Sequence, residues 1–326
     1  PVTPALAGGN PSLPRTVMSL VSSPTGARLY FEELEPAPGE PFGVRTRGFG
    51  VAEEIPGTGR FQASPTLVWA GDRPRYGTAA VVKEGDVYAF GCVNAGFLAA
   101  DCYVARAPVA SMADEAAYSY YEGSGRFTSD PARAWPVVRG AGTSIAVAWS
   151  PARNRYVMVY ATPLGKTWHA RTGLAPEGPW SDDHEIAAAD LGGDGDAFVV
   201  GVALHPELLA GDRARIPVTY ALAAFSGDFA TRQGASPERL GPKLTLLALP
   251  DDLPLAGCTR RAVHQTNGQP GGSDRLLSSV RPAPRSVPGI DHDDAAAPEV
   301  ANTARGNRRA AAVRDSRDLR VQRRDR

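Results

Sequence analysis

A pattern that recurs three times along the chain restricts the folds that it can adopt. Each copy contains a turn, an apolar run typical of a β-strand, a loop, and then an aromatic residue followed three positions later by an arginine. These arginines are Arg45, Arg106 and Arg171, at intervals of 61 and 65 residues. A fourth unit, at residues 194–250, has the apolar runs but lacks the aromatic and arginine signature. A strand-rich unit repeated at such intervals is typical of repeat architectures.

The second copy shows the order of strands within a unit most clearly. Residues 78–82 form an almost wholly apolar run, as expected of an innermost strand covered on both faces, and Gly85 supplies a tight turn into residues 87–92. Residues 103–107 and 118–121 follow as the third and fourth strands. Four antiparallel strands per unit, repeated around an axis, are typical of a β-propeller. No segment sustains a helical apolar period, so we predict an all-β fold.

The repeat also sets the expected domain boundaries. We predict a β-propeller at residues 16–256, with four recognisable blades of a five-bladed ring at residues 16–64, 65–130, 136–190 and 194–250. Residues 1–15 are rich in proline and are expected to be a linker or an interblade connection, with one blade missing upstream. Residues 257–326 contain no aromatic residue, which leaves too little apolar area to offset the entropy of ordering, so we expect a disordered tail there.

The repeated arginine and aromatic residue have a structural interpretation. An arginine at one position of every blade is expected to span neighbouring blades, pairing with a carboxylate or with backbone carbonyls. The aromatic side chain is expected to fill the wedge between blades. A catalytic group rarely recurs once per repeat, so this signature predicts the fold and not the chemistry.

Charge and hydropathy disfavour two classes of partner. The formal net charge is zero, so the chain has no global field that would attract nucleic acid. The expected tail carries a formal charge of +6, but its aspartates dilute the field that phosphate binding needs. No apolar stretch reaches the roughly 20 residues needed to span a bilayer. We therefore expect no nucleic-acid partner and no membrane span.

Two cysteines flank one excursion between strands of the second unit. Paired strands could bring Cys92 and Cys102 within disulfide reach, which would favour an oxidising compartment. The alternative is a pair of buried thiols in neighbouring strands. The chain begins at Pro1 without a signal peptide, so we interpret it as a processed protein or a fragment.

Ligands of propellers bind at one mouth of the central channel, on loops and on the ends of the innermost strands. Acidic residues next to those strands are therefore candidates for catalysis, namely Asp72, Asp196 and Glu207. Glycoside hydrolysis requires two carboxylates that face each other across the sugar. Spacing along the sequence does not show whether these three converge.

A second acidic cluster precedes the fourth unit. Asp190 and Asp194, followed by Asp196, alternate with glycines, and carboxylate oxygens on a flexible loop can converge on a hard cation such as calcium. The cluster does not fit the spacing of an EF-hand, and the same residues are common in ordinary solvated turns. We therefore expect a plain turn and no cofactor, with a structural calcium ion as the alternative.

Several segments resemble an uncharacterised bacterial five-bladed β-propeller family, related to furanosidase-like glycosidases, some members of which resemble endo-D-arabinanases. The segments that carry the resemblance are residues 75–82, 87–92, 105–108, 118–123 and 203–208. The resemblance covers residues 15–250 and implies a secreted or cell-envelope protein that acts on or binds a polysaccharide such as an arabinan. Members carry acidic catalytic groups on early blades with a Phe-Gly-Asp-type signature, which this chain lacks.

Two functional hypotheses follow. In the first, the chain is a glycoside hydrolase in which the candidate acid and base are among Asp72, Asp196 and Glu207. In the second, it is a non-catalytic sugar-binding or scaffolding propeller. Arg75 and Tyr76 would then contribute hydrogen bonds and stacking to the sugar, and His205 is a further candidate for substrate binding.

Overall fold

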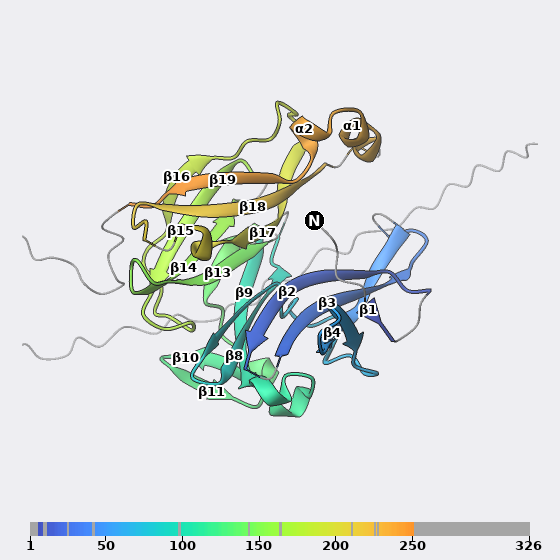
Figure 1. The fold of residues 1–326 in the computed structure, drawn as a ribbon, viewed down its shortest axis with the longest axis vertical. Coiled ribbons are helices and arrows are strands. Elements are labelled where there is room, and N and C mark those ends of the chain that lie inside the picture. Colours follow the sequence, from blue (N-terminus) through green and yellow to red (C-terminus); the bar gives the residue numbers. More distant parts are fainter. Residues whose placement is uncertain are drawn as a thin grey trace, which may run out of the picture. The chain divides into compact units, whose positions relative to one another are not determined.

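The computed structural model describes residues 6–250, apart from residues 9–11, 25, 41–42, 97–98, 143, 163–164, 210, 225 and 227. The chain divides into two compact units, residues 1–263 and 264–326. The second unit, and with it the expected tail at residues 257–326, lies outside the described residues. The fold below is that of the first unit (Figure 1).

The first sheet is built from the first repeat. Its strands are β1 (Leu6–Ala7), β2 (Arg15–Ser23), β3 (Gly26–Pro36), β4 (Val44–Ile55), β5 (Arg60–Ala63) and β6 (Trp69–Ala70), and their order in the sheet is β1-β5-β4-β3-β2, with β6 also paired to β4. Strand β1 pairs in parallel with the outer strand β5. Leu6 and Ala7 therefore pair within a blade, in a segment that the sequence predicted to be a linker or an interblade connection.

The second sheet follows the predicted strand order closely. It contains β7 (Ala79–Lys83), β8 (Asp86–Asn94), β9 (Ala100–Pro108), β10 (Ser119–Gly123), β11 (Arg126–Thr128) and β12 (Val138–Ala141), in the order β11-β10-β9-β8-β7, with β12 also paired to β9. Glu84 and Gly85 both adopt positive φ at the β7–β8 turn. The glycine takes this conformation without strain, which is why the hairpin turns there.

The third and fourth sheets complete the described fold. The third contains β13 (Ile145–Ser150), β14 (Arg155–Ala161), β15 (Thr167–Gly173) and β16 (His184–Ala188), and the fourth contains β17 (Ala197–Leu204), β18 (Arg215–Ala224) and β19 (Lys243–Ala248), each in sequential antiparallel order. Two short helices, α1 (Phe229–Ala235) and α2 (Pro237–Leu240), connect β18 to β19. The sequence did not predict them, because neither is long enough to show a helical apolar period.

The four sheets are blades of a β-propeller. The first strand of each, namely β2, β7, β13 and β17, contacts the first strand of the next blade in chain order. Hydrophobic clusters fill the three spaces between successive blades. The prediction of an all-β propeller with four recognisable blades is therefore confirmed, and a fifth blade stays a prediction.

An aromatic cluster fixes the first blade against the second. The rings of Tyr30, Trp69, Tyr76, Tyr118 and Tyr120 pack together, and all five side chains are buried. The Tyr118 hydroxyl donates to the Met112 carbonyl at 2.8 Å and lies 2.8 Å from the Tyr30 hydroxyl. Because Tyr118 has one proton to donate, Tyr30 is the donor in the second bond. Burial raises the pKa of the Tyr30 phenol above its usual 10.

The repeated arginines occupy equivalent third strands, but their partners differ from the expectation. Arg45 pairs with Glu35 at 2.6 Å and Arg106 with Asp86 at 3.7 Å, so each contacts a carboxylate of its own blade. The arginine reaches across a strand pair and not across the interblade space. The aromatic position does lie between blades in one copy, where Trp168 is buried and packs against Tyr220 of the fourth blade.

Candidate functional site

The ends of the blades at which β2, β7, β13 and β17 begin are called the mouth. Blades are related by rotation about a common axis, so equivalent strands run in the same direction and these four strand starts lie at one end. The second strands of the blades end at the mouth. Arg15, the first residue of β2, pairs with Glu33 near the end of β3. Ile145, the first residue of β13, pairs with Tyr160 near the end of β14.

Two consecutive buried carboxylates lie at the mouth of the first blade. Glu33 is 2% exposed, and its Oε2 accepts hydrogen bonds from Arg15 Nε at 2.9 Å and Nη2 at 2.8 Å, while Arg47 pairs with its Oε1. The Arg15 side chain is 10% exposed, whereas that of Arg47 is 50% exposed. A buried carboxylate is stable only when charges and hydrogen bonds compensate it, and Glu33 has both.

The neighbouring carboxylate reaches the loop that joins the first two blades. Glu32 accepts a hydrogen bond from Thr46 Oγ1 at 2.7 Å and pairs with the Arg75 guanidinium. Arg75 Nε is buried and has no hydrogen-bond partner among the described residues. The Arg75 side chain nevertheless remains 36% exposed, so part of it is accessible to a ligand.

The third blade carries a second polar cluster at the mouth. His169 Nδ1 lies 2.8 Å from Asp183 Oδ2, and the Tyr160 hydroxyl donates to Asp183 Oδ1. Arg171 Nε donates to the Tyr160 oxygen at 3.0 Å, and the Tyr160 and His169 rings are stacked at 5.8 Å. Burial, and the hydrogen bond to Asp183, raise the pKa of the Tyr160 phenol, which keeps it a donor. Asp183 is 39% exposed and so presents a fixed acceptor to solvent.

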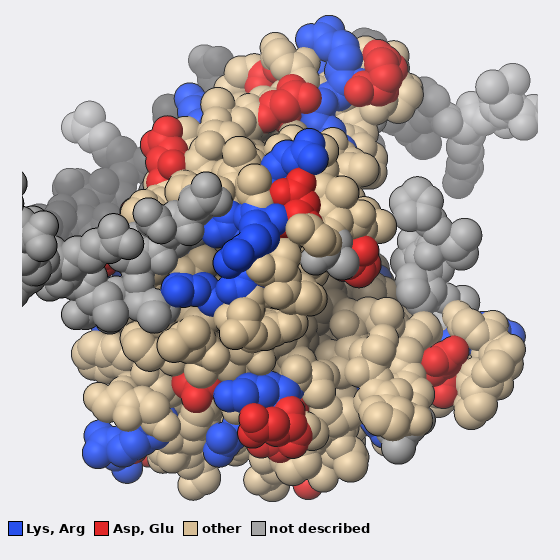
Figure 2. Space-filling model, turned by 60° about the vertical axis from the view of Figure 1, so that its left-hand side comes forward, with Lys and Arg blue, Asp and Glu red and all other residues tan. Residues whose placement is uncertain are grey.

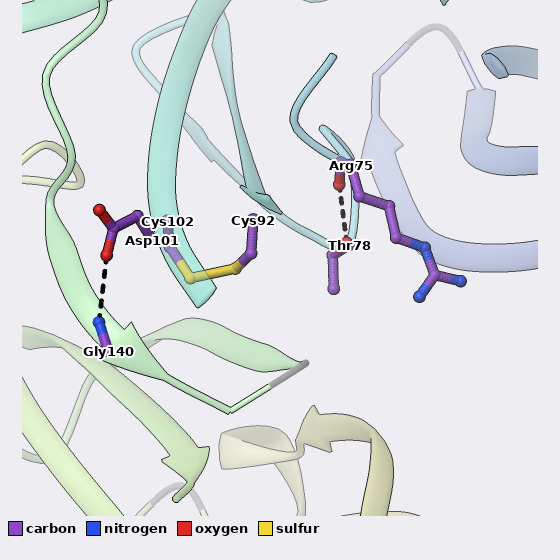
Figure 3. Close-up of a disulfide and its surroundings, with 6 residues drawn as sticks. All are labelled: Arg75, Thr78, Cys92, Asp101, Cys102 and Gly140. Atoms are coloured by element: carbon purple, nitrogen blue, oxygen red, sulfur yellow. Dashed lines mark hydrogen bonds between the residues drawn. A yellow bond between two sulfur atoms is a disulfide. The ribbon is translucent and has the colours of Figure 1, made fainter. Parts of the chain in front are cut away.

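A disulfide supports the second blade beside the mouth loop, which is the loop of residues 71–78 that joins the first two blades (Figure 3). Cys92 and Cys102 are directly paired residues of β8 and β9, and their sulfurs are bonded. The Arg75 N–H donates to the Cys92 carbonyl at 3.0 Å, while the Arg75 side chain points away from the disulfide. On the other side, Asp101 Oδ1 accepts from the Gly140 N–H at 3.2 Å.

The structure does not bring the three predicted catalytic carboxylates together. Asp72 is exposed on the loop between the first two blades, and Asp196 directly precedes β17. Glu207 follows the opposite end of β17, and eight residues of strand at about 3.3 Å each separate the two ends by about 26 Å. Paired glycosidase carboxylates lie within about 10 Å of each other, so Asp196 and Glu207 cannot act as such a pair on one sugar.

The acidic loop before the fourth blade is used for ion pairing. Asp190 pairs with Lys243 Nζ at 2.7 Å, and this hydrogen bond lowers the pKa of the Asp190 carboxyl. Asp194 pairs with Arg232, and hydrogen bonds from Ser226 together with the Arg232 charge lower the pKa of Asp196. No group of three or more potential metal ligands converges in the described part of the chain. These ion pairs fit the interpretation as a plain turn, and a calcium ion bound by Asp190 and Asp194 stays a prediction.

The predicted substrate-binding residues have different surroundings. Arg75 lies at the mouth, as expected. Tyr76 is 1% exposed, with Trp69 and Tyr120 against its ring, so it cannot stack on a sugar in this conformation. His205 lies at the opposite end of the fourth blade, where its ring contacts Glu207 and Thr219.

Glycines explain why Tyr76 is buried. A Cβ on Gly91 would lie 2.3 Å from the Tyr76 nitrogen, and a Cβ on Gly77 would lie 2.4 Å from the Tyr30 ring. Gly77 also has a φ of +93°, which disfavours other residues. These two positions let the mouth loop lie directly on both blades.

Sequence reasoning missed Glu32, Glu33 and Asp183. A signal for the first two exists in the sequence, because they interrupt the apolar segment at residues 29–34, where an unpaired charge would not be tolerated. Asp183 lies in a connection whose course the sequence does not reveal.

Comparison with known proteins places the chain in a family. Residues 53–222 match the family described as "Domain of unknown function (DUF4185)". The chain belongs to this family. No curated protein matches it.

Similar solved structures include several glycoside hydrolases. The GH43_1 enzyme from Xanthomonas citri complexed with xylose is 17% identical, with a TM-score of 0.42, covering 73% of this chain and 70% of that chain. The family 117 glycoside hydrolase Zg3597 from Zobellia galactanivorans is 10% identical, with a TM-score of 0.41 and coverages of 76% and 75%. The alpha-L-arabinanase of Cellvibrio cellulosa is 11% identical, with a TM-score of 0.39 and coverages of 71% and 72%. Similarity at this level does not indicate a substrate for the chain.

Proposed function

We propose that this chain is a carbohydrate-active propeller that binds a polysaccharide, such as an arabinan, at the mouth. The observation that carries the proposal is that exposed hydrogen-bonding groups there are held in place by buried partners. Arg47 and Arg75 are each fixed by a buried glutamate, and Asp183 is fixed by Tyr160 and His169. Sugar hydroxyls both donate and accept, so a surface that offers guanidinium donors and a carboxylate acceptor suits them.

Preorganisation supports binding by this surface. A long side chain that is already immobilised in the free protein loses less conformational entropy when a ligand contacts it. Glu33, at 2% exposed, holds Arg47 without competing for the ligand.

Among the residues that the structure describes, no helix has the length and apolar character of a membrane span.

Glycoside hydrolysis is the second candidate function. It is favoured by Asp183, which is 39% exposed at the mouth and is hydrogen-bonded to a protonated phenol and to an imidazole. One carboxylate of a catalytic pair needs a fixed position relative to the scissile bond, and these partners supply it. A hydrolase would need a second carboxylate facing Asp183 across the sugar.

We also propose that the chain works in an oxidising compartment, as a secreted protein or at the cell envelope. The Cys92–Cys102 disulfide supports this location, because structural disulfides persist mainly outside the reducing cytosol. A polysaccharide ligand would be encountered there.

Binding is tested by titrating the chain with arabinan and with xylan, and with dextran as a reference, in a calorimeter. We expect Arg47→Gln and Asp183→Asn each to weaken binding about tenfold or more, because hydrogen bonds to charged groups contribute about 1.5–3 kcal/mol each. Arg126→Gln and Asp228→Asn are matched controls, since both side chains are exposed and ion-paired outside the mouth clusters.

Two results would overturn the binding proposal: no polysaccharide binds the wild-type chain, or both mouth variants bind as well as the wild type. Release of reducing sugar on the same glycans separates hydrolysis from binding. Turnover by the wild type that Asp183→Asn abolishes would establish Asp183 as catalytic, and binding without turnover would exclude the second candidate.

A further inference from the structure

Trp135 is the most exposed tryptophan of the chain, at 55%. It lies in the connection between β11 and β12, at the outer edge of the second blade. Both faces of this blade are covered, since β7 contacts β2 and β13, and hydrophobic clusters fill the spaces toward the first and third blades. The exposure of Trp135 therefore does not result from an unfilled blade position.

Three contacts hold the segment that carries this indole. The Trp135 N–H donates to the Tyr121 carbonyl at 2.7 Å. Two residues earlier, Arg133 pairs at 2.6 Å with Glu122, whose side chain is mostly buried. Gly123 lies against the base of the indole, because a Cβ on this glycine would be 3.8 Å from Trp135 Cγ. An aromatic side chain on a fixed segment loses little conformational entropy when a ligand packs on it.

A guanidinium lies beside the ring of Trp135. Arg139 Cζ is 5.2 Å from the centre of the ring, and Arg139 Nη1 donates to Asp101 Oδ2 at 3.4 Å. Asp101 is itself held by the Gly140 N–H, as Figure 3 shows. The Arg139 side chain is 60% exposed, whereas that of Asp101 is 19% exposed. Since a guanidinium has five N–H donors, Arg139 keeps donors for a ligand that contacts the ring.

A phenol extends this polar group along β9. Tyr103 lies two residues after Asp101, so both side chains are on the same face of the strand. Cys102 and Val104, on the other face, are buried against the third blade. Burial, together with the Asp101 charge, raises the pKa of the Tyr103 phenol, which therefore stays protonated and can donate.

These side chains lie at the mouth end of the second blade. Because β7 begins at the mouth and pairs with β8 in antiparallel fashion, β8 ends there and β9 begins there. Asp101, the second residue of β9, pairs with Val93 of β8. The residue before Val93 is Cys92, whose carbonyl accepts the Arg75 N–H. Neighbouring strands are about 4.8 Å apart, so the group around Asp101 lies next to the loop that carries Arg75.

We propose that the outer edge of the second blade carries an outer sugar subsite, formed by Trp135, Arg139, Asp101 and Tyr103. One sugar ring packs its apolar C–H face on the indole, and its hydroxyls bond to the polar side chains beside it. This inference rests on the proposed binding of polysaccharide at the mouth. It assigns a place to sugar units of the same polysaccharide that lie beyond Arg75.

The subsite makes affinity depend on the length of the glycan. A disaccharide held at Arg75 and Asp183 does not reach Trp135, whereas a polymer contacts both places at once. Removal of the indole should therefore weaken binding of the polymer and leave binding of the disaccharide unchanged. Loss of a residue that only supports the fold would weaken both.

Calorimetric titration of the full chain with linear arabinan, with xylan and with the disaccharide of each sugar tests the subsite. Trp135→Ala should weaken binding of the polymer about tenfold, as expected for loss of an aromatic packing partner. Arg139→Gln should weaken it about fivefold, for loss of a hydrogen-bond donor. Neither variant should change the affinity for the disaccharide.

Two variants serve as controls. Trp149→Ala removes the other exposed tryptophan, which lies at the end of β13 remote from the mouth, and should change neither affinity. Trp135→Phe keeps an aromatic ring at the subsite and should retain most of the affinity for the polymer.

Tryptophan fluorescence locates the contact directly. Acrylamide quenches exposed indoles, so the polymer should protect the wild type from quenching, and this protection should be lost in Trp135→Phe and kept in Trp149→Ala.

Equal polymer affinity of the wild type and Trp135→Ala, or equal weakening for polymer and disaccharide, would overturn the subsite and leave binding at the mouth intact. Polymer binding that depends on Trp135 but not on Arg47 or Asp183 would support the sugar site at Trp135 and overturn the proposed function of the mouth. If the wild type binds neither polymer, both proposals are overturned.

Discussion

Replacing Glu33 by glutamine should expose how much the first blade depends on its buried charges. Glu33→Gln preserves the shape of the side chain but leaves Arg15, which is 10% exposed, without its counter-charge. Removing one partner of a buried ion pair costs about 3–5 kcal/mol. Because Arg47 is 50% exposed and can turn toward water, and because the amide oxygen still accepts one hydrogen bond, we expect the lower end, about 3 kcal/mol.

Urea unfolding followed by tryptophan fluorescence measures this loss, since urea carries no charge and does not screen the ion pair. With a urea dependence of about 3 kcal/mol per molar, the midpoint should fall by about 1 M. Glu53→Gln is the control, because Glu53 is 55% exposed in its pair with Arg28, and a surface pair contributes about 0–1 kcal/mol. Equal midpoints for the two variants would refute the argument that burial makes the Glu33 pairs important.

Three further predictions concern the blades. Replacing Cys92 and Cys102 by serine should lower the free energy of unfolding by about 2–3 kcal/mol, as expected for a cross-link across ten residues, with the urea midpoint of the oxidised chain as reference. Gly77→Ala should destabilise more than Gly85→Ala in the same assay, because both have positive φ but only the Gly77 Cβ would meet a ring, at 2.4 Å; equal losses would contradict this. Stability should fall as pH rises from about 10 to about 12, since an unfolded tyrosine releases its proton near pH 10 while burial raises the pKa of Tyr220 to about 12 in the folded chain. Urea midpoints between pH 8 and pH 11.5 test this, and Tyr220→Phe should reduce the decline only in part, because the pKa values of Tyr30 and Tyr160 are raised as well.

The repeat in the sequence predicted the blades because it depends on local chemistry. Alternation of apolar residues, and turn glycines such as Gly85, define strands and hairpins without long-range information. The partner of Arg45 could not be predicted in the same way. Its carboxylate, Glu35, lies on a neighbouring strand, and which strand faces which charged group depends on the pairing register.

The candidate site was predictable only in part. Arg75 was identified because it precedes an innermost strand, but its partner Glu32 is 43 residues away, a contact that exists only after two blades pack. Asp190 resembles a cation ligand until Lys243, 53 residues later, supplies the charge that satisfies it. In contrast, the separation of Asp196 from Glu207 follows from the length of one strand, which the sequence alone indicates.

The loop between the first two blades, residues 71–78, forms hydrogen bonds to both blades. The Gly71 N–H donates to the Arg47 carbonyl, and the Gly77 N–H donates to the Phe90 carbonyl. Ser19 Oγ donates to the Gly77 carbonyl. These hydrogen bonds fix the backbone of the loop, so a ligand should contact Arg75 without rearrangement of the backbone. Association would then be limited by diffusion and orientation, and differences in affinity between glycans would arise mainly from how fast each one dissociates.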